Sequence, residues 1–415
     1  MTLRAARNRT HTRLAQHFLR SGMLRSYRGR FGLTLFCAAA VLSLAGCTST
    51  GAERVLFFPT AAHLDEKQEN WVVPIEGWVY VPKRGRILRN WGFNWLASKL
   101  GLKKDEEYEA ARKIFEARAD SFIVDGKPGR VLFVHIGDER HMSPPTDSAG
   151  RFGFEIKLPA EKASELAEDN RIQYRARRKT LGGTYYFLGH SLLVGPTGVS
   201  VISDIDDTIK ISNITVKGEM VRSMFIREFQ PVPGMAEIYR RWAAEEGAIF
   251  HYVSGSPSQL FTALSEFVRR ERFPDQAVFA LKRIGWFDSF MSNLWKSARV
   301  TKPPVIRRIL DDFPDRDFIL VGDSGEHDPE VYAEAAREHP DQVLHIYIRD
   351  VTGDQPDGER YRQAFKDVPR WKWTIFSDAA ELQPIDLLFA IRERETGGQA
   401  LATDGREDRR PEAAR

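Results

Sequence analysis

The sequence predicts an α/β fold: a Rossmann-like parallel sheet covered by helices, preceded by a smaller β-sandwich-like domain. From Val199 onward, short apolar strands alternate with helices, which is the pattern of a parallel sheet buried on both faces. Between residues 71 and 195, strand patterns recur at short intervals with polar turns between them, as in a sandwich of antiparallel strands. We therefore expect two folded domains, at 71–195 and 196–392.

The smaller domain is expected to contain a helical insertion. Residues 71–81 alternate between apolar and polar side chains like a strand. Apolar residues at helical spacing predict helices over 86–119. Further strands are predicted at 121–124, 130–136, 150–157, 172–176 and 185–194.

Strands and helices alternate regularly in the larger domain. Its predicted strands are 199–203, 249–253, 318–321 and 343–348. Its predicted helices are 235–246, one that opens at Ser256-Pro257, 303–313 and 329–339. Ser256 is expected to cap the helix that starts at Pro257. Residues 393–415 are charged and glycine-rich, and we expect them to form a disordered tail.

The first 47 residues have the order of an export signal. They contain eight arginines and no acidic residue, and a short apolar run at 31–46 follows the basic part. This run is shorter than the roughly 20 residues that a spanning helix needs. Leu44-Ala-Gly-Cys47 resembles the lipobox of bacterial lipoproteins, which implies a lipid on Cys47. The alternatives are a single-pass anchor or a chance apolar stretch, and Met23 is an alternative start to Met1.

The leader places the rest of the chain outside the cytoplasm. We expect residues 1–46 to be a lipoprotein signal peptide and 47–70 a tether to the bacterial cell envelope, at its periplasmic face. Thr48, after Cys47, would permit the outer membrane. Cys37 and Cys47 are the two cysteines of the chain, so no thiol is expected in the mature protein beyond the lipidated one.

Bulk charge gives no sign of a nucleic-acid partner. The net charge of +4 becomes −4 when the eight arginines of the leader are set aside. The sequence gives no indication of a protein partner either.

The densest group of carboxylates stands at the end of the first strand of the larger domain. Asp204-Ile-Asp206-Asp207-Thr208 directly follows the apolar strand 199–203. Carboxylates this close raise each other's pKa unless a cation lies among them. Hard oxygen ligands favour Mg²⁺. A solvated acidic turn is the alternative for the group taken alone.

Three further groups of polar residues accompany these carboxylates in the larger domain. Ser254 and Gly255 follow the strand 249–253, Lys302 opens a helix, and Gly322-Asp323 to Asp328 follow the strand 318–321. The carboxyl ends of parallel strands meet at one edge of the sheet, where active sites are built. These residue types suit phosphoryl transfer, in which a carboxylate attacks, a second one moves protons and cationic groups neutralise the phosphoryl oxygens.

This set of motifs, in this order, resembles the haloacid-dehalogenase superfamily of phosphohydrolases. The resemblance implies that Asp204 is the nucleophile and Asp206 the general acid and base. It implies that Ser254 and Lys302 contact the phosphoryl group, with Thr208 and Gly255 beside the substrate. The implied Mg²⁺ ligands are Asp204, the carbonyl of Asp206, Asp323 and Asp328.

Several neighbouring residues are given lesser roles. Asp207 is expected to point away from its neighbours as a helper or turn residue. Lys296 is the alternative to Lys302. Glu326 and His327 are expected to be loop residues, with His327 also able to touch substrate.

The individual residues within these motifs resemble one family of the superfamily more closely than the others. Asp204 to Lys210, Ser254 to Pro257 and Gly322 to Tyr332 look like the catalytic domain of the actin-patch phosphatidate phosphatase family. This resemblance implies Mg²⁺-dependent removal of phosphate from phosphatidate, a phospholipid substrate at a membrane surface. The alternatives are a periplasmic phosphomonoesterase with a soluble substrate and a scaffolding lipoprotein with a vestigial phosphatase module. The aromatic and basic segments 220–229 and 284–295 could rest on a membrane or be ordinary flap and core residues.

Overall fold

The computed structural model describes residues 52–83, 86–180, 183–216, 218–283 and 298–407. The expected signal peptide, with Cys47, lies outside these residues, as does Lys296. No helix among the described residues is both long enough and apolar enough to cross a membrane.

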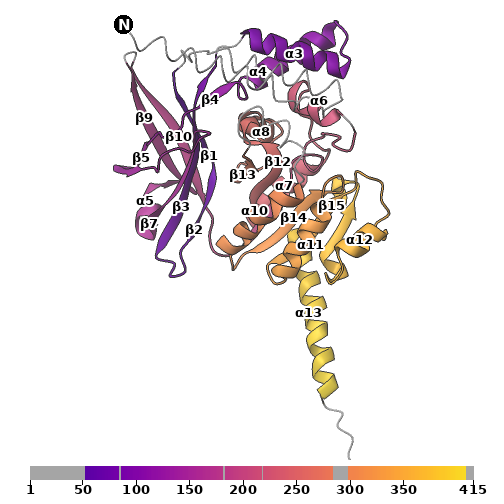
Figure 1. The fold of residues 1–415 in the computed structure, drawn as a ribbon. Helices are drawn as coiled ribbons and strands as arrows, with labels where there is room; N and C mark the ends of the chain where they lie inside the picture. The colour runs from indigo at the N-terminus through magenta and orange to yellow at the C-terminus, as the bar shows by residue number, and fades with distance from the viewer. Residues whose placement is uncertain (1–51, 84–85, 181–182, 217, 284–297, 408–415) are drawn as a thin grey trace, which may run out of the picture. The chain divides into compact units, whose positions relative to one another are not determined.

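The predicted parallel sheet is present in the second half of the chain (Figure 1). Its six strands lie in the order β13-β12-β11-β14-β15-β16, and every neighbouring pair is parallel. Every residue of β11 is buried, as its β-branched composition suggests. The strands are β11 Val199–Ser203, β12 Ile249–Pro257, β13 Ala277–Lys282, β14 Asp317–Asp323, β15 Val343–Arg349 and β16 Trp373–Phe376.

Helices cover both faces of this sheet. Alternate residues of β11 enter different hydrophobic clusters, Val201 in one and Ile202 in the other. The cluster of Val201 includes side chains of α7 Met235–Glu246, α8 Phe261–Arg270 and α13 Ile385–Glu407. The cluster of Ile202 includes side chains of α10 Ala298–Asp312, α11 Asp328–Glu338 and α12 Glu359–Ala364.

The N-terminal strands form a ten-stranded mixed sheet. The path is β1-β3-β2-β10-β9-β5-β6, with β4 and β7 paired to β3 and β8 paired to β9. All pairs are antiparallel except β2 with β10. One cluster of apolar side chains from β3, β5, β7 and β9 forms its core. The strands are β1 Arg54–Phe58, β2 Thr60–Leu64, β3 Asn70–Pro82, β4 Val124–Gly126, β5 Phe133–Ile136, β6 Glu139–Met142, β7 Arg151–Pro159, β8 Ala167–Glu168, β9 Arg171–Thr180 and β10 Gly183–Leu193.

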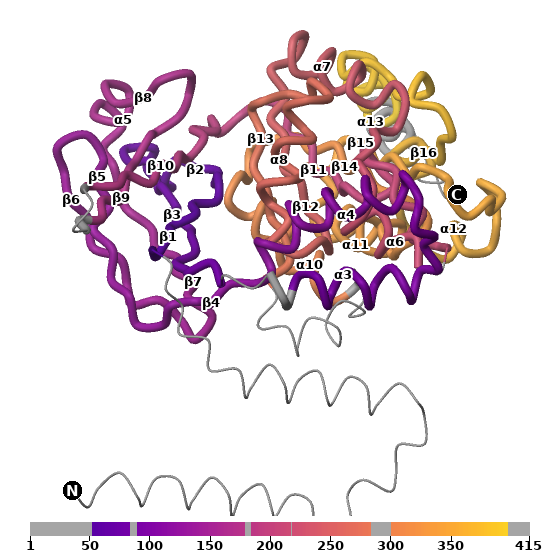
Figure 2. The backbone as a smooth tube through the Cα atoms, turned by 90° about the horizontal axis from the view of Figure 1, so that it is seen from above, coloured from indigo at the N-terminus to yellow at the C-terminus, as the bar shows by residue number. Residues whose placement is uncertain are grey.

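The predicted helical insertion is also present. It consists of α3 Arg86–Leu100 and α4 Glu106–Ala119, and a shorter helix, α5, spans Ala160–Leu166. Figures 1 and 2 both place α3 and α4 beside α6, Glu219–Phe225. The apolar side chains of α3 and α4 share a cluster with Ile226, which directly follows α6.

Two stretches carry more regular structure than their composition suggests. Strands β1 and β2 lie within 47–70, where a tether is expected, because β1 pairs with β3 and buries Phe57 and Phe58. Helix α13 continues to Glu407, beyond residue 393 where the tail is expected to begin.

Within 220–229, Met224, Ile226 and Phe229 are buried, so these apolar side chains are core residues rather than a membrane-facing set. The second aromatic segment, 284–295, lies outside the described residues.

Candidate active site

Three adjacent strands carry the expected site residues to one edge of the parallel sheet. Strand β11 lies between β12 and β14. Asp204 directly follows β11, Ser254 lies near the end of β12, and Asp323 ends β14. The backbone N–H of Asp204 donates to the carbonyl of Val321 at 2.9 Å, which continues the pairing of β11 with β14 past the end of the strand. The register of the sheet therefore places residues more than 100 positions apart beside one another.

Lys302 reaches this edge from helix α10. Its Nζ lies 2.9 Å from Asp204 Oδ1, 2.5 Å from Asp328 Oδ1 and 3.2 Å from Glu326 Oε2. The side chain is 1% exposed. Burial alone would lower the pKa of Lys302, but the carboxylates around it outweigh burial and raise the pKa well above its ordinary value. Lys302 is therefore a permanent positive charge in the site, and Glu326, expected to be a loop residue, belongs to its surroundings.

Three buried carboxylates gather around this lysine. Asp204, Asp323 and Asp328 each offer an oxygen, and these oxygens all lie within 4.8 Å of one another. Burial, the largest cause, and the neighbouring carboxylates raise the pKa of Asp204 and of Asp323 well above the ordinary value, against the opposing effect of Lys302. Asp323 Oδ2 is buried and accepts no hydrogen bond from the described residues. A set of buried carboxylate oxygens with one oxygen unpartnered fits a divalent cation.

Gly322 is required by the close approach of Asp328. A Cβ at position 322 would lie 2.4 Å from Asp328 Oδ2 and 2.7 Å from Asp328 Cβ. The same oxygen, Asp328 Oδ2, accepts the backbone N–H of Asp323 at 3.2 Å. A side chain at position 322 would therefore push Asp328 away from the other two carboxylates.

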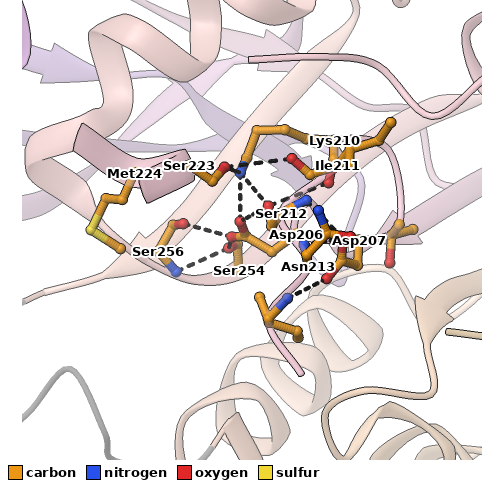
Figure 3. A network of polar contacts seen from close by, with 12 residues as sticks. Asp206, Asp207, Lys210, Ile211, Ser212, Asn213, Ser223, Met224, Ser254 and Ser256 are labelled. Atoms are coloured by element: carbon orange, nitrogen blue, oxygen red, sulfur yellow. Dashed lines mark hydrogen bonds and ion pairs between the residues drawn. The ribbon is translucent and has the colours of Figure 1, made fainter. Parts of the chain in front are cut away.

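Asp206 lies in a separate polar network, shown in Figure 3. Its Oδ1 lies 2.6 Å from Lys210 Nζ and accepts from Ser212 Oγ at 2.6 Å. Its Oδ2 accepts from Ser256 Oγ at 2.7 Å and from Ser254 Oγ at 3.3 Å. Burial alone would raise the pKa of Asp206, but Lys210 and the hydroxyl donors outweigh burial and lower it to about 2. The surroundings of the two carboxylates therefore shift their pKa values in opposite directions, upward for Asp204 and downward for Asp206.

Lys210 is itself held by the helix that follows it. Its Nζ donates to Ser223 Oγ at 3.2 Å and lies 4.9 Å from the centre of the Phe229 ring. Arg118 of the helical insertion donates to the carbonyl of Ser223 at 2.8 Å and to that of Met224 at 3.0 Å. The Arg118 guanidinium lies 3.8 Å from the centre of the same Phe229 ring. Contacts therefore run without interruption from α4 to Asp206.

The carboxylate of Asp207 has a local role in the loop. Its φ of 55° is left-handed, a conformation that Asp tolerates better than most residues. Its carboxylate accepts the backbone N–H groups of Ser212, Asn213 and Ile214 at 2.7, 2.8 and 2.7 Å. The loop after Lys210 is thus folded around Asp207, which points away from Asp204 as its place in the sequence suggests.

The structure corrects the role expected for Ser256. Strand β12 continues through Pro257, and the helical turn begins only at Ser258, without a side-chain cap. The Ser256 hydroxyl is free to donate to Asp206.

Sequence reasoning also missed Lys210 and Ser212. Lys210 belongs to the Asp204–Lys210 motif, but spacing alone does not show where its ammonium group lies.

Of the two residues expected beside a substrate, Thr208 contacts a carboxylate and Gly255 borders open space. Thr208 Oγ1 donates to Asp204 Oδ2 at 3.4 Å, and Thr208 is buried. Gly255 has open space where a Cβ would stand, with no heavy atom within 4 Å. A pocket of about 490 Å³ opens beside Glu326, and its lining is polar or charged apart from glycine. It includes His327, Thr352 and Arg360.

Comparison with known proteins shows what the parallel-sheet part of the chain is similar to. Residues 199–350 match the family model for the catalytic domain of phosphatidate phosphatase APP1. This segment is similar to the APP1 catalytic-domain family. The APP1-type segment runs from β11 to the end of β15 and contains the carboxylates, serines and lysines described above, whereas Arg118, Thr352 and Arg360 lie outside it. The motif residues of the sequence predict this similarity, and the family model confirms it.

Two fungal proteins are similar over the same region. Phosphatidate phosphatase APP1 of Saccharomyces cerevisiae is 40% identical over 167 residues, which are 40% of this chain and 28% of the yeast protein. An uncharacterised protein of Schizosaccharomyces pombe is 32% identical over 160 residues, 38% of this chain and 26% of that protein. The alignments therefore span about a quarter of the length of these curated relatives. A comparison with solved structures found a sialyltransferase from Photobacterium damsela, aligned over 48% of this chain and 33% of the sialyltransferase chain at 8% identity. The TM-score of 0.20 is too low to indicate a shared fold.

Proposed function

We propose that this protein is a Mg²⁺-dependent phosphatidate phosphatase, which converts phosphatidate to diacylglycerol and phosphate through an aspartyl-phosphate on Asp204. The observation that carries the proposal is the separation of the two carboxylates: Asp204 lies beside Lys302 and two further carboxylates, and Asp206 lies in its own hydrogen-bond network. The substrate rests on the similarity to the yeast enzyme. We assign the parallel-sheet domain to the haloacid-dehalogenase type because its site lies at the carboxyl ends of adjacent strands.

The reaction proceeds in two displacements. In the first, a carboxylate oxygen of Asp204 forms a bond to phosphorus, and the bond from phosphorus to the glycerol oxygen breaks. The negative charge of the bound phosphate group raises the pKa of Asp206 from its value of about 2 in the free site, so that the carboxyl carries a proton. Asp206 gives this proton to the glycerol oxygen, and diacylglycerol leaves. In the second, water attacks the phosphorus, Asp206 takes its proton, and the bond from phosphorus to Asp204 breaks to release phosphate. One carboxylate thus serves first as acid and then as base.

The remaining groups neutralise and position the phosphoryl oxygens. Lys302 supplies an ammonium next to Asp204, and Ser254 supplies a hydroxyl next to Asp206. Asp204, Asp323, Asp328 and the carbonyl of Asp206 would hold Mg²⁺, which supplies positive charge against the phosphoryl oxygens. Asp323 Oδ2, buried without a hydrogen bond, is the oxygen that most needs such a charge.

We further propose that Cys47 carries a lipid and that the protein is anchored to the cell envelope. The support is the order of basic segment, apolar run and Leu44-Ala-Gly-Cys47. The first described strand begins at Arg54, seven positions after Cys47, so the folded part would stay close to the bilayer. Proximity of this kind raises the effective concentration of a membrane substrate.

A soluble phosphomonoester is the second candidate substrate, and the polar lining of the pocket beside Glu326 favours it. Hydrolysis of phosphatidate in mixed micelles is compared with that of soluble monoesters, each with Mg²⁺ and with a chelator. We expect phosphatidate to have the higher kcat/KM, the chelator to stop turnover and Asp204→Asn to abolish it. Faster turnover of the soluble esters would assign a soluble substrate. Equal rates for the wild type and Asp204→Asn would indicate a scaffold instead.

A further inference from the structure

One face of the N-terminal sheet is turned to solvent and combines arginines with large apolar side chains. Burial alternates along β9, where Tyr174 and Ala176 face the core and Arg175 and Arg177 are exposed. We define the outer face as the exposed side of β5, β6, β9 and β10. The register places Leu188 of β10 opposite Arg175, so side chains of both kinds stand next to each other.

The apolar side chains of the outer face are unusually exposed. Phe133 is 47% exposed, Met142 68%, Tyr186 54% and Leu188 73%. Phe133 and Met142 are directly opposed on β5 and β6, and Tyr186 and Leu188 are alternate residues of β10. Single exposed apolar residues are common on protein surfaces, but several on adjoining strands mark a surface that binds something.

Arginines lie among these apolar groups. The guanidinium of Arg140 lies 4.7 Å from the centre of the Phe133 ring, and that of Arg175 lies 5.5 Å from the centre of the Tyr186 ring. Neither Arg140, Arg175 nor Arg177 forms a salt bridge with the part of the chain that the structure describes. The outward positions of the four strands hold no Asp or Glu. Glu168, the last residue of β8, accepts a hydrogen bond from Gln173 at 2.6 Å at the end of the face.

We infer that the outer face docks on an anionic phospholipid bilayer. Arginine binds phosphate groups through two parallel hydrogen bonds, and each cation near an anionic membrane adds to the attraction. Aromatic and aliphatic side chains beside those cations can enter the boundary between headgroups and acyl chains. A nucleic acid would satisfy the arginines but would leave Leu188 and Met142 in water, whereas a bilayer accommodates both kinds of group.

The docking face is independent of the phosphatase chemistry. It lies on the N-terminal sheet, and none of its residues belongs to the network of Asp204 or of Asp206. Loss of the face would therefore leave the catalytic residues intact, and loss of the reaction would leave vesicle binding intact. The two proposals can fail separately.

The test is flotation of the mature chain, residues 47–415, with vesicles. The change Cys47→Ala and the removal of the basic leader ensure that neither an acyl chain nor the leader holds the protein to the bilayer. We expect binding to vesicles that contain phosphatidylglycerol and weak binding to pure phosphatidylcholine, with release by high salt. The triple variant Arg140→Ala/Arg175→Ala/Arg177→Ala should bind the anionic vesicles at least about tenfold more weakly, because each arginine contributes independently. Leu188→Ser should weaken binding about fivefold through lost apolar contact.

Matched controls remove the same charge and the same apolar group elsewhere. Arg240→Ala/Arg362→Ala/Arg394→Ala changes net charge equally, and Leu387→Ser removes a leucine that is 43% exposed on α13. Both controls should bind like the parent, and thermal midpoints should show that every variant is folded. Equal loss in the control triple, equal binding to both kinds of vesicle, or no binding by the parent would overturn the inference. Capture of polyglutamate but not of vesicles would likewise overturn it, in favour of an acidic protein partner.

Discussion

Lys210 and Asp206 form a buried ion pair four residues apart, with 2.6 Å between Lys210 Nζ and Asp206 Oδ1. The side chain of Lys210 is 3% exposed and that of Asp206 16%, so the pair is largely shielded from water. A lysine at this position gives the proposed acid and base a fixed orientation. Loss of the lysine would leave a buried carboxylate without its counter-charge, which is costly.

We expect Lys210→Met to lower kcat by on the order of 100-fold for alkyl phosphates, with little change in KM. The loss should be much smaller for p-nitrophenyl phosphate, whose leaving group does not need a proton. Steady-state kinetics on both substrates measures the difference. Lys366→Met, an exposed lysine, is the control and should behave like the wild type. Equal losses on both substrates would show that Lys210 does not act through Asp206.

Arg118→Met should destabilise the protein by about 2–3 kcal/mol, because the carbonyls of Ser223 and Met224 would lose a buried charged donor. The same change should lower kcat for alkyl phosphates, since Ser223 also holds Lys210. Urea unfolding and the kinetics above measure the two effects. Arg112→Met on the same helix removes a partly exposed pair with Glu116 and should cost less than about 1 kcal/mol. Equal costs for the two arginines would refute the special role of Arg118.

Asp323→Asn should stabilise the metal-free protein and abolish the response to Mg²⁺. Asp204, Asp323 and Asp328 repel one another when no cation is bound, so removal of one charge relieves the repulsion. In the wild type, Mg²⁺ should raise the thermal midpoint by several degrees, on the order of 2 kcal/mol at saturating metal. Thermal unfolding with Mg²⁺ and with a chelator measures both effects. An Mg²⁺ response that survives in Asp323→Asn would place the cation elsewhere.

Two buried histidines should make the protein less stable in acid. Burial, aided by nearby cationic groups, lowers the pKa of His251 and of His345 to about 3, so both are neutral in the folded state. The unfolded chain binds protons at both with a pKa near 6.5. Between about pH 6 and pH 4 the unfolded state therefore holds about two more protons at these two sites, which lowers stability by roughly 2–3 kcal/mol for each unit of acidification. The raised pKa values of Asp204 and Asp323 act in the opposite direction, so the two histidines are tested by the difference between variants.

Urea unfolding across this pH range measures that slope. The double variant His251→Phe/His345→Gln removes both proton sites and should flatten the dependence, whatever its stability at neutral pH. His339→Gln, a partly exposed histidine, should leave the slope as it is. A double variant with the slope of the wild type would show that other groups govern the acid response.

The motif residues could be predicted because backbone geometry alone determines their place. Asp204, Ser254 and Asp323 each stand at the end of an apolar strand, and parallel pairing must bring such ends together. Lys302 was predicted as well, although α10 begins four residues before it. The parallel sheet followed from the alternation of apolar strands with helices.

The residues that surround Asp206 could not be predicted in this way. Lys210, Ser212 and Arg118 act through long or mobile side chains, whose direction depends on packing that spacing does not reveal. The pair Ser256-Pro257 predicts a helix cap, because Ser-Pro is typical of one. In the structure the pairing of β12 with β13 shifts in register between Ser254 and Pro257, and the strand continues past the serine. The pairing of β12 with β13 therefore outweighs the local preference of Ser-Pro for the start of a helix.

The order of strands β12, β11 and β14 has a consequence for how activity arises during folding. Their site residues are far apart in sequence and meet only when two parallel pairings, each closing a long loop, are complete. Such long-range pairings are the slow steps of folding. A collapsed intermediate with native helices would hold its carboxylates on disconnected strand ends and would have no nucleophile in place. Recovery of turnover after dilution from denaturant therefore reports completion of the central sheet, and not the earlier return of helical structure.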